Sequence, residues 1–150
     1  MHACIASGAA FLICVLWFEL MFDVQTRNQP GPALPSEVLA SISSYYRRVT
    51  IEAYPMNRLI ALVMVLTLIA IVTEIIRNTD HWWIGWISLA SAVSAIGLAR
   101  IRTIPNAARL GRAKGSIESQ TTLARAIYRD HIYCIAAIAV VLVLQLTAAL

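Results

Sequence analysis

The sequence predicts an all-α integral membrane protein, an antiparallel bundle of four transmembrane helices that forms one domain over residues 1–150. Apolar residues make up 59% of the chain and charged residues 13%, whereas soluble domains average about half and about a quarter. The mean hydropathy is +0.72. Four separate apolar runs are each close to the roughly 20 residues that a helix needs to cross a bilayer.

The predicted spans cover about residues 3–22, 59–76, 82–101 and 132–150. No basic residue precedes the first run, which favours a retained helix over a signal peptide, because a signal peptide begins with positive charge. Only residues 77–81 join the second and third runs, so these two are expected to form a hairpin. The runs show no alternation with period two, which favours helices over barrel strands.

The basic residues are distributed very unevenly along the chain. Of the 12 Lys and Arg residues, only Arg77 lies in the hairpin, and the other 11 flank or occupy the two long polar segments. By the positive-inside rule both long segments are cytoplasmic, and the N-terminus, the hairpin and the C-terminus lie on the other side. Trp82, Trp83 and Trp86 fit an outer aromatic belt. We expect a plasma membrane, the inner membrane of a bacterium.

Each long cytoplasmic segment is expected to carry an interfacial amphipathic helix. Ser36 is predicted to cap the first, which extends toward Tyr54. Its apolar residues recur at helical spacing: Val38, Leu39, Ile42, Tyr45, Tyr46 and Val49. In the second segment Pro105 can begin a short helix, and Ser116 is predicted to cap a helix that continues into the last span.

A set of polar residues is expected at the cytoplasmic ends of the spans. Glu19 and Asp23 are four residues apart and share a helix face. Glu19 lies about one turn inside an apolar run, where an ionised carboxylate is costly, so it should have a partner. In one interpretation Glu19, Glu52 or His131 handles protons in a catalytic or binding site. In the other, the polar residues form ion pairs that hold the helices together.

Further candidate binding residues lie at the same membrane level. They are Asp23, Asn57, Arg58, Arg100, Arg102, Arg109 and Arg129. The basic run RIRTIPNAARLGRAK, residues 100–114, can attract anionic lipid headgroups, or it can serve only to set the topology. Membrane lipids are therefore expected partners, together with a second copy of the chain or another protein. The charge distribution is not that of a nucleic-acid-binding protein.

No metal ion or other cofactor is predicted. Carboxylate and imidazole ligands from Glu19, Asp23, Glu52 and His131 would suit iron or manganese, but they do not form the Glu-x-x-His pairs of di-metal bundles. The chain's 3 cysteines show no CxxC or zinc-ligand spacing. At the outer end of the second span, Glu74 is expected to pair with Arg77 or His81.

The third span is predicted to be the central helix of the bundle. Small residues recur along it in steps of three: Gly85, Ser88, Ser91, Ser94 and Gly97. Such residues let helix backbones approach closely, and serines can hydrogen-bond between helices.

The last third of the chain contains Thr103-Ile104-Pro105-Asn106 after an apolar helix, then Leu110, a polar stretch, and Arg129 with His131 before the last helix. This arrangement resembles the anthrone-oxygenase-like family of small four-helix membrane proteins. The resemblance implies a four-helix bundle and oxidation of a hydrophobic aromatic substrate at a site that includes Asn106 and His131.

Three classes of function are compatible with this sequence. The first, which we expect, is a non-catalytic membrane component that binds a lipid or a protein partner. The second is an enzyme acting on a hydrophobic substrate at the cytoplasmic interface, which needs Glu19, Glu52, Asn106 or His131 to line a pocket. The third is a small transporter, which the lack of charged residues at mid-membrane disfavours.

Overall fold

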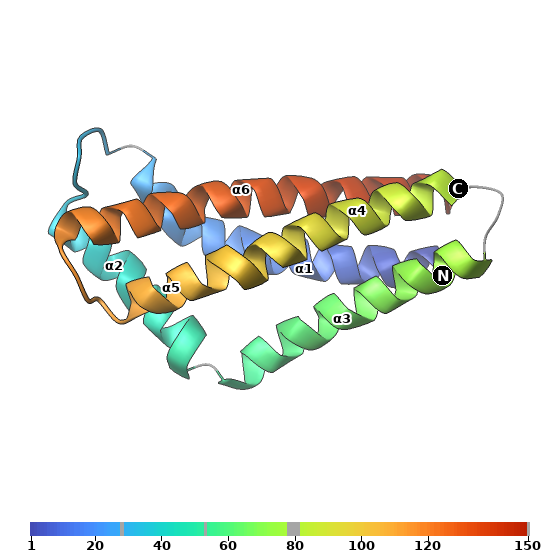
Figure 1. Cartoon of the computed structure of the whole chain (residues 1–150), viewed down its shortest axis with the longest axis horizontal. Helices are drawn as coiled ribbons and strands as arrows, with labels where there is room; N and C mark the ends of the chain where they lie inside the picture. Colours follow the sequence, from blue (N-terminus) through green and yellow to red (C-terminus); the bar gives the residue numbers. More distant parts are fainter. Residues whose placement is uncertain (28, 53, 78–81, 150) are drawn as a thin grey trace.

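The computed structural model describes residues 1–27, 29–52, 54–77 and 82–149, which are helical almost throughout and include no strand. The long helices are α1 (His2–Asp23), α3 (Tyr54–Arg77), α4 (Trp82–Leu98) and α6 (Ile117–Thr147). Two shorter helices are α2 (Ser36–Arg47) and α5 (Ile104–Gly111). Figure 1 shows both termini at one end of the molecule and α2 and α5 at the other.

Four helices are long and apolar enough to cross a membrane, in agreement with the predicted four-span, all-helical class. They are His2–Thr26, Pro55–Arg77, Trp82–Gly111 and Ile117–Thr147. The third extends well beyond residue 101, because a π-helical segment, Ala99–Thr103, joins α4 to α5 without a break. The fourth begins at Ile117. Ser116 is its N-cap residue, and the Ser116 side chain accepts a hydrogen bond of 3.3 Å from the Ser119 N–H, as the sequence predicts.

The main core centres on α6, which packs along both α1 and α4. The prediction that the third span is central is therefore wrong. Residues spaced three apart do not stay on one face of a helix. The small residues of α4 therefore contact different neighbouring helices. Gly85 lies against Ile75 of α3, whereas Ser88 and Ala95 contact Gln145 and Cys134 of α6.

A second core lies at the end opposite the termini, between α2, α5 and α6. Its buried residues are Leu34, Leu39, Ile42, Tyr46, Ala107, Leu110, Ala124 and Ile127. The apolar face of α2, which the sequence suggested would lie on a lipid interface, is thus covered by the protein itself. Pro35, not Ser36, takes the N-cap position of α2, and among the described residues no side chain caps this end.

The segment before α2 is held against α6 by side chains of α6. The Arg125 guanidinium donates hydrogen bonds to the carbonyls of Gln29, at 3.1 Å, and Gly31, at 2.7 Å. The Leu34 N–H donates to Thr121 Oγ1 at 3.0 Å. These contacts fix where α2 begins, and hence where its side chains meet α1 and α6.

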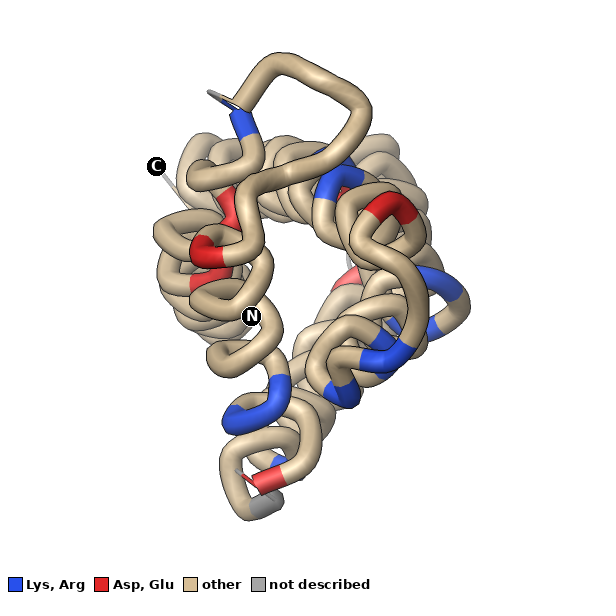
Figure 2. Tube along the Cα trace, turned by 90° about the vertical axis from the view of Figure 1, so that its left-hand side faces the viewer, with Lys and Arg blue, Asp and Glu red and all other residues tan. Residues whose placement is uncertain are grey.

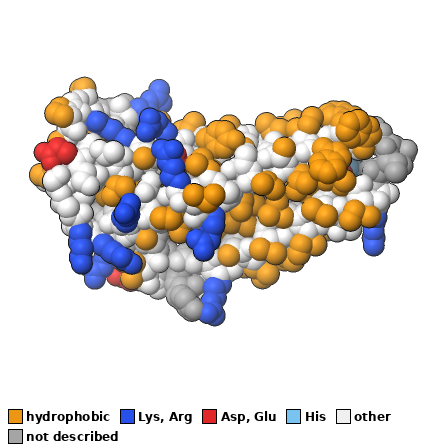
Figure 3. Space-filling view, viewed as in Figure 1, with side chains coloured by type: hydrophobic (Ala, Val, Ile, Leu, Met, Phe, Trp, Pro, Cys, Tyr) orange, Lys and Arg blue, Asp and Glu red, His pale blue; other side chains and the backbone are white. Residues whose placement is uncertain are grey.

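The surface divides into an apolar part and a basic part. Figure 3 shows hydrophobic side chains over the half that holds the termini and most Lys and Arg side chains around α2 and α5. The end-on view of Figure 2 shows basic positions distributed around that end. Exposed large apolar residues such as Trp17, Leu62 and Val143 lie on the long helices. A lipid-facing surface is expected to be apolar in this way, because lipid replaces water as its solvent.

Candidate functional site

Four side chains from three helices meet near the end of α1 that faces α2, and we call them the His131 cluster: Glu19, Asp23, Tyr46 and His131. His131 Nδ1 lies 2.6 Å from Asp23 Oδ2, and His131 Nε2 lies 2.9 Å from Glu19 Oε2. The Tyr46 hydroxyl donates to Asp23 Oδ1 at 2.7 Å. Asp23, Tyr46 and His131 are buried, whereas the Glu19 side chain is 23% exposed. Glu19 thus has the partner that its position requires.

The two contacts of His131 set the number of protons in the cluster. A neutral imidazole has one N–H, so it can donate to only one of two ionised carboxylates. Both contacts are hydrogen bonds only if one further proton is present, on the imidazole or on either carboxylate. Two carboxylates then contribute two negative charges and the further proton one positive charge. With that proton present, the cluster carries a net charge of minus one, whichever of the three groups holds the proton.

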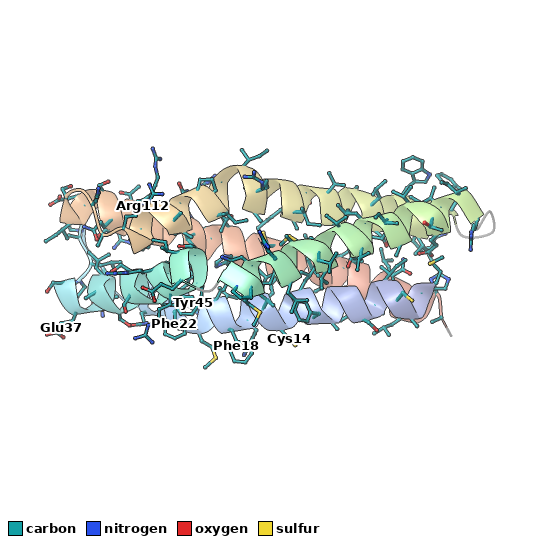
Figure 4. The ribbon with its side chains drawn as sticks, turned by 90° about the horizontal axis from the view of Figure 1, so that it is seen from below. Cys14, Phe18, Phe22, Glu37, Tyr45 and Arg112 are labelled. Carbon is teal, nitrogen blue, oxygen red and sulfur yellow. The ribbon has the colours of Figure 1, made fainter. Side chains whose placement is uncertain are left out.

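Tyr46 supports the cluster as a fixed hydrogen-bond donor. Burial, and after it the negative charge of Asp23, raises the pKa of the Tyr46 hydroxyl well above its usual value. The hydroxyl therefore keeps its proton at physiological pH. The neighbouring Tyr45 ring stacks on Phe22 with centroids 4.0 Å apart, and Figure 4 shows these two rings together beside α1.

The His131 cluster borders a cavity of about 460 Å³, a volume within the range of small-molecule sites. Most of its wall is apolar, with side chains such as Leu12, Leu16, Ile60, Met64, Ile96 and Ile138. Glu19 and His131 form its charged end. None of the described residues that line it is Lys or Arg. The cavity therefore combines an apolar body with one acidic end.

A separate ion pair lies next to this cluster. Asp130, one residue before His131, is buried, and its Oδ2 lies 3.2 Å from Arg102 Nε and 3.3 Å from the donating hydroxyl of Thr103. The Arg102 side chain is 48% exposed, so water screens much of the attraction. This pair joins α6 to the π-helical segment after α4. Glu19 is the carboxylate among the described residues of the cavity wall.

The other sequence candidates lie apart from the His131 cluster. Glu52 is exposed and pairs with Arg47 at 3.2 Å. Asn106 is half-buried on α5 and is not among the described residues that line the cavity, whereas Asn57 lines it. All five arginines predicted to bind are exposed, namely Arg58, Arg100, Arg102, Arg109 and Arg129.

Tyr46 is the member of the cluster that sequence reasoning did not propose as a site residue. It stood among the apolar residues of the amphipathic face of α2, and only its hydroxyl distinguished it from a core residue. A tyrosine at a position expected to be buried needs a hydrogen-bond partner, and this was the signal available.

A second polar group lies at the terminus end of the molecule. His2 Nδ1 lies 3.0 Å from Glu74 Oε1 and 2.8 Å from Gln145 Oε1, and Gln145 donates to Ser88 Oγ at 3.2 Å. The expected pairing of Glu74 with Arg77 is wrong: Arg77 is exposed, and Glu74 turns toward α1. The alternative partner, His81, lies outside the described residues.

Within the described ranges, no group of three or more His, Cys, Asp and Glu side chains is arranged to hold a metal ion. In the His131 cluster both imidazole nitrogens already face carboxylate oxygens. Cys4, Cys14 and Cys134 are free thiols.

The chain matches no protein-family model, no curated protein and no solved structure. The resemblance to the anthrone-oxygenase-like family therefore stays a prediction. Of the two residues that it implies, His131 lies at the cavity and Asn106 lies outside its lining.

Proposed function

We propose that this chain is an integral membrane protein that binds a small lipophilic molecule or a lipid chain in the cavity beside the His131 cluster. One observation carries the proposal, namely a cavity of about 460 Å³ whose wall is largely apolar and has Glu19 and His131 at one end. An amphiphile fits such a site because its apolar part leaves water and its polar part meets hydrogen-bonding groups.

The arrangement of the helices gives such a ligand a route from the bilayer. Figure 1 shows the first half of α3 diverging from α4. Met56 and Ala61, on this part of α3, line the cavity and are also exposed. A molecule dissolved in the cytoplasmic leaflet would thus reach the cavity without crossing water, provided that α2 and α5 lie at the cytoplasmic interface.

We propose an antiparallel bundle with α2 and α5 on the cytoplasmic side, because the basic residues concentrate at that end. Reporter fusions after residue 150 and within residues 112–116 are expected to report opposite sides of the membrane. A fusion within 29–33 should agree with the one at 112–116. The same side for the C-terminus and either polar segment would contradict this orientation.

Filling the cavity should abolish binding without harming the fold. Ala99 is half-buried on the cavity wall, so the ring of Ala99→Phe would occupy ligand space. We expect the purified parent protein to gain thermal stability from lipophilic ligands, since a ligand that binds the native state stabilises it. Ala99→Phe should lose that gain while unfolding at a temperature near or above that of the ligand-free parent.

Ala90→Phe is the matched control, because Ala90 is an exposed residue of α4 outside the cavity lining. It should keep the full ligand-induced shift. Equal shifts in the parent, Ala99→Phe and Ala90→Phe would contradict binding in this cavity and would point to a nonspecific effect of the amphiphile.

A second candidate function is proton-transfer chemistry on a lipophilic substrate at the same place. The observation that favours it is the continuous chain of contacts from Tyr46 through Asp23 and His131 to Glu19. A histidine oriented by one carboxylate and facing another can accept and return a proton. Conversion of a bound ligand by the parent but not by His131→Gln, with binding retained in both, would favour this function over binding alone.

A further inference from the structure

We propose that the ligand of this cavity is a lipophilic cation, an apolar molecule whose delocalised positive charge lies against Glu19. The inference rests on the proposed binding function and specifies the charge of the ligand.

The His131 cluster brings negative charge to one end of the cavity. With both hydrogen bonds of His131 made, the cluster carries a net charge of minus one. Its neighbour Asp130 is paired with Arg102 and adds no net charge. The partly exposed carboxylate of Glu19 lies on the cavity wall. A cation in the cavity would neutralise this charge in surroundings of low dielectric constant, where the attraction is stronger than in water.

The rest of the cavity wall suits a cation better than an anion. Of the described lining residues none is Lys or Arg, so an anion would meet Glu19 without a compensating basic group. Tyr45 and Tyr46 line the cavity beside Glu19, and their rings pack edge to face with centroids 5.3 Å apart. Aromatic faces attract cations, most strongly where water is excluded. The stack of Tyr45 on Phe22 fixes the orientation of one of these rings.

Hydration distinguishes a lipophilic cation from a small inorganic ion in such a cavity. An apolar wall cannot replace the water shell of a small inorganic ion, which would therefore lose hydration without compensation. A cation whose charge is spread over aromatic or alkyl groups is weakly hydrated and gains from the same wall. The cavity therefore favours a cation that carries aromatic or alkyl groups over a metal ion or the unsubstituted ammonium ion.

The test uses tetraphenylphosphonium and tetraphenylborate, two ions of nearly the same shape and opposite charge, with neutral tetraphenylsilane as a third probe. Binding to the purified full-length protein in detergent is measured by equilibrium dialysis. The amount of each probe retained by Ala99→Phe is subtracted from the amount retained by the parent, which corrects for partition of the probe into the detergent. We expect cavity-dependent binding in the order cation, neutral compound, anion.

Glu19→Gln keeps the size of the side chain and removes its charge. It should weaken binding of the cation about tenfold or more, as expected for loss of one partner from a desolvated charge pair, and leave the neutral probe unchanged. Glu52→Gln is the matched control, because Glu52 is exposed and lies outside the described lining. It should bind all three probes as the parent does.

The outcomes separate this inference from the proposed function. If the neutral probe or the anion binds in the cavity as tightly as the cation, or if Glu19→Gln binds the cation like the parent, the ligand is not selected by charge. If no probe shows binding that Ala99→Phe removes, the proposed function itself fails. Should Glu19→Gln not fold, the comparison of cation with anion in the parent still decides the inference.

Discussion

His131→Ala is expected to lower the free energy of unfolding by about 3–5 kcal/mol, the usual cost of removing one partner from a buried ion pair. His131 is buried, and each of its ring nitrogens faces a carboxylate oxygen. Its loss would leave Asp23 and Glu19 close together without the group that shares a proton with them. The measurement is the free energy of unfolding in mixed micelles, supported by the melting temperature.

Two variants make this result specific to the His131 cluster. Glu52→Ala breaks the exposed pair with Arg47 and should cost no more than about 1 kcal/mol. Asp23→Asn combined with His131→Ala should cost less than the sum of the two single changes, because both residues belong to one network. A His131→Ala protein as stable as the parent would show that the cluster does not hold α1 to α6.

The agreement between sequence and structure is closest where a single physical requirement acts. An apolar run of sufficient length must be helical in lipid, and this requirement accounts for the four long helices. Likewise a carboxylate inside an apolar run needs a partner, and Glu19 has one in His131, at 2.9 Å. The spacing of Glu19 and Asp23 put them on one helix face, where both now contact the same imidazole.

The sequence predictions differ from the structure where one surface could pack against more than one partner. The apolar face of α2 would suit a lipid interface or a protein core, and periodicity alone cannot distinguish the two. The spacing of small residues in α4 indicates close helix packing but does not specify the partner helix. Glu74 had a basic residue three positions along the chain, yet it contacts His2 at 3.0 Å. Contacts between residues so far apart in sequence depend on how the helices pack, which no local pattern specifies.

Gly111→Ala is expected to destabilise the protein by about 1–3 kcal/mol, the usual cost of forcing extra volume into a packed contact. A Cβ atom at Gly111 would lie 2.8 Å from the Arg47 nitrogen and 2.9 Å from the Tyr46 carbonyl carbon. Both are backbone atoms of α2, so no side chain can rotate away, and α2 must move from α5. The melting temperature measures the effect.

Gly97→Ala is the matched control, because a Cβ atom there would have no heavy atom of a neighbouring helix within 4 Å in the part of the chain that the structure describes. Alanine favours a helix over glycine by about 1 kcal/mol, so this variant should be as stable as the parent or more stable. A loss of stability in Gly97→Ala equal to that in Gly111→Ala would contradict close packing as the cause.

The Gly111 contact should also affect the His131 cluster, because α2 supplies Tyr46. In the parent, Tyr46→Phe removes the hydroxyl that donates to Asp23 Oδ1 at 2.7 Å and should cost about 1.5–3 kcal/mol, as for hydrogen bonds to charged groups. In the Gly111→Ala background α2 has already shifted, so the same change should cost less. If Tyr46→Phe lowers the free energy of unfolding equally in both backgrounds, α2 moves without separating Tyr46 from Asp23. The α2–α5 packing and the His131 cluster would then be energetically independent.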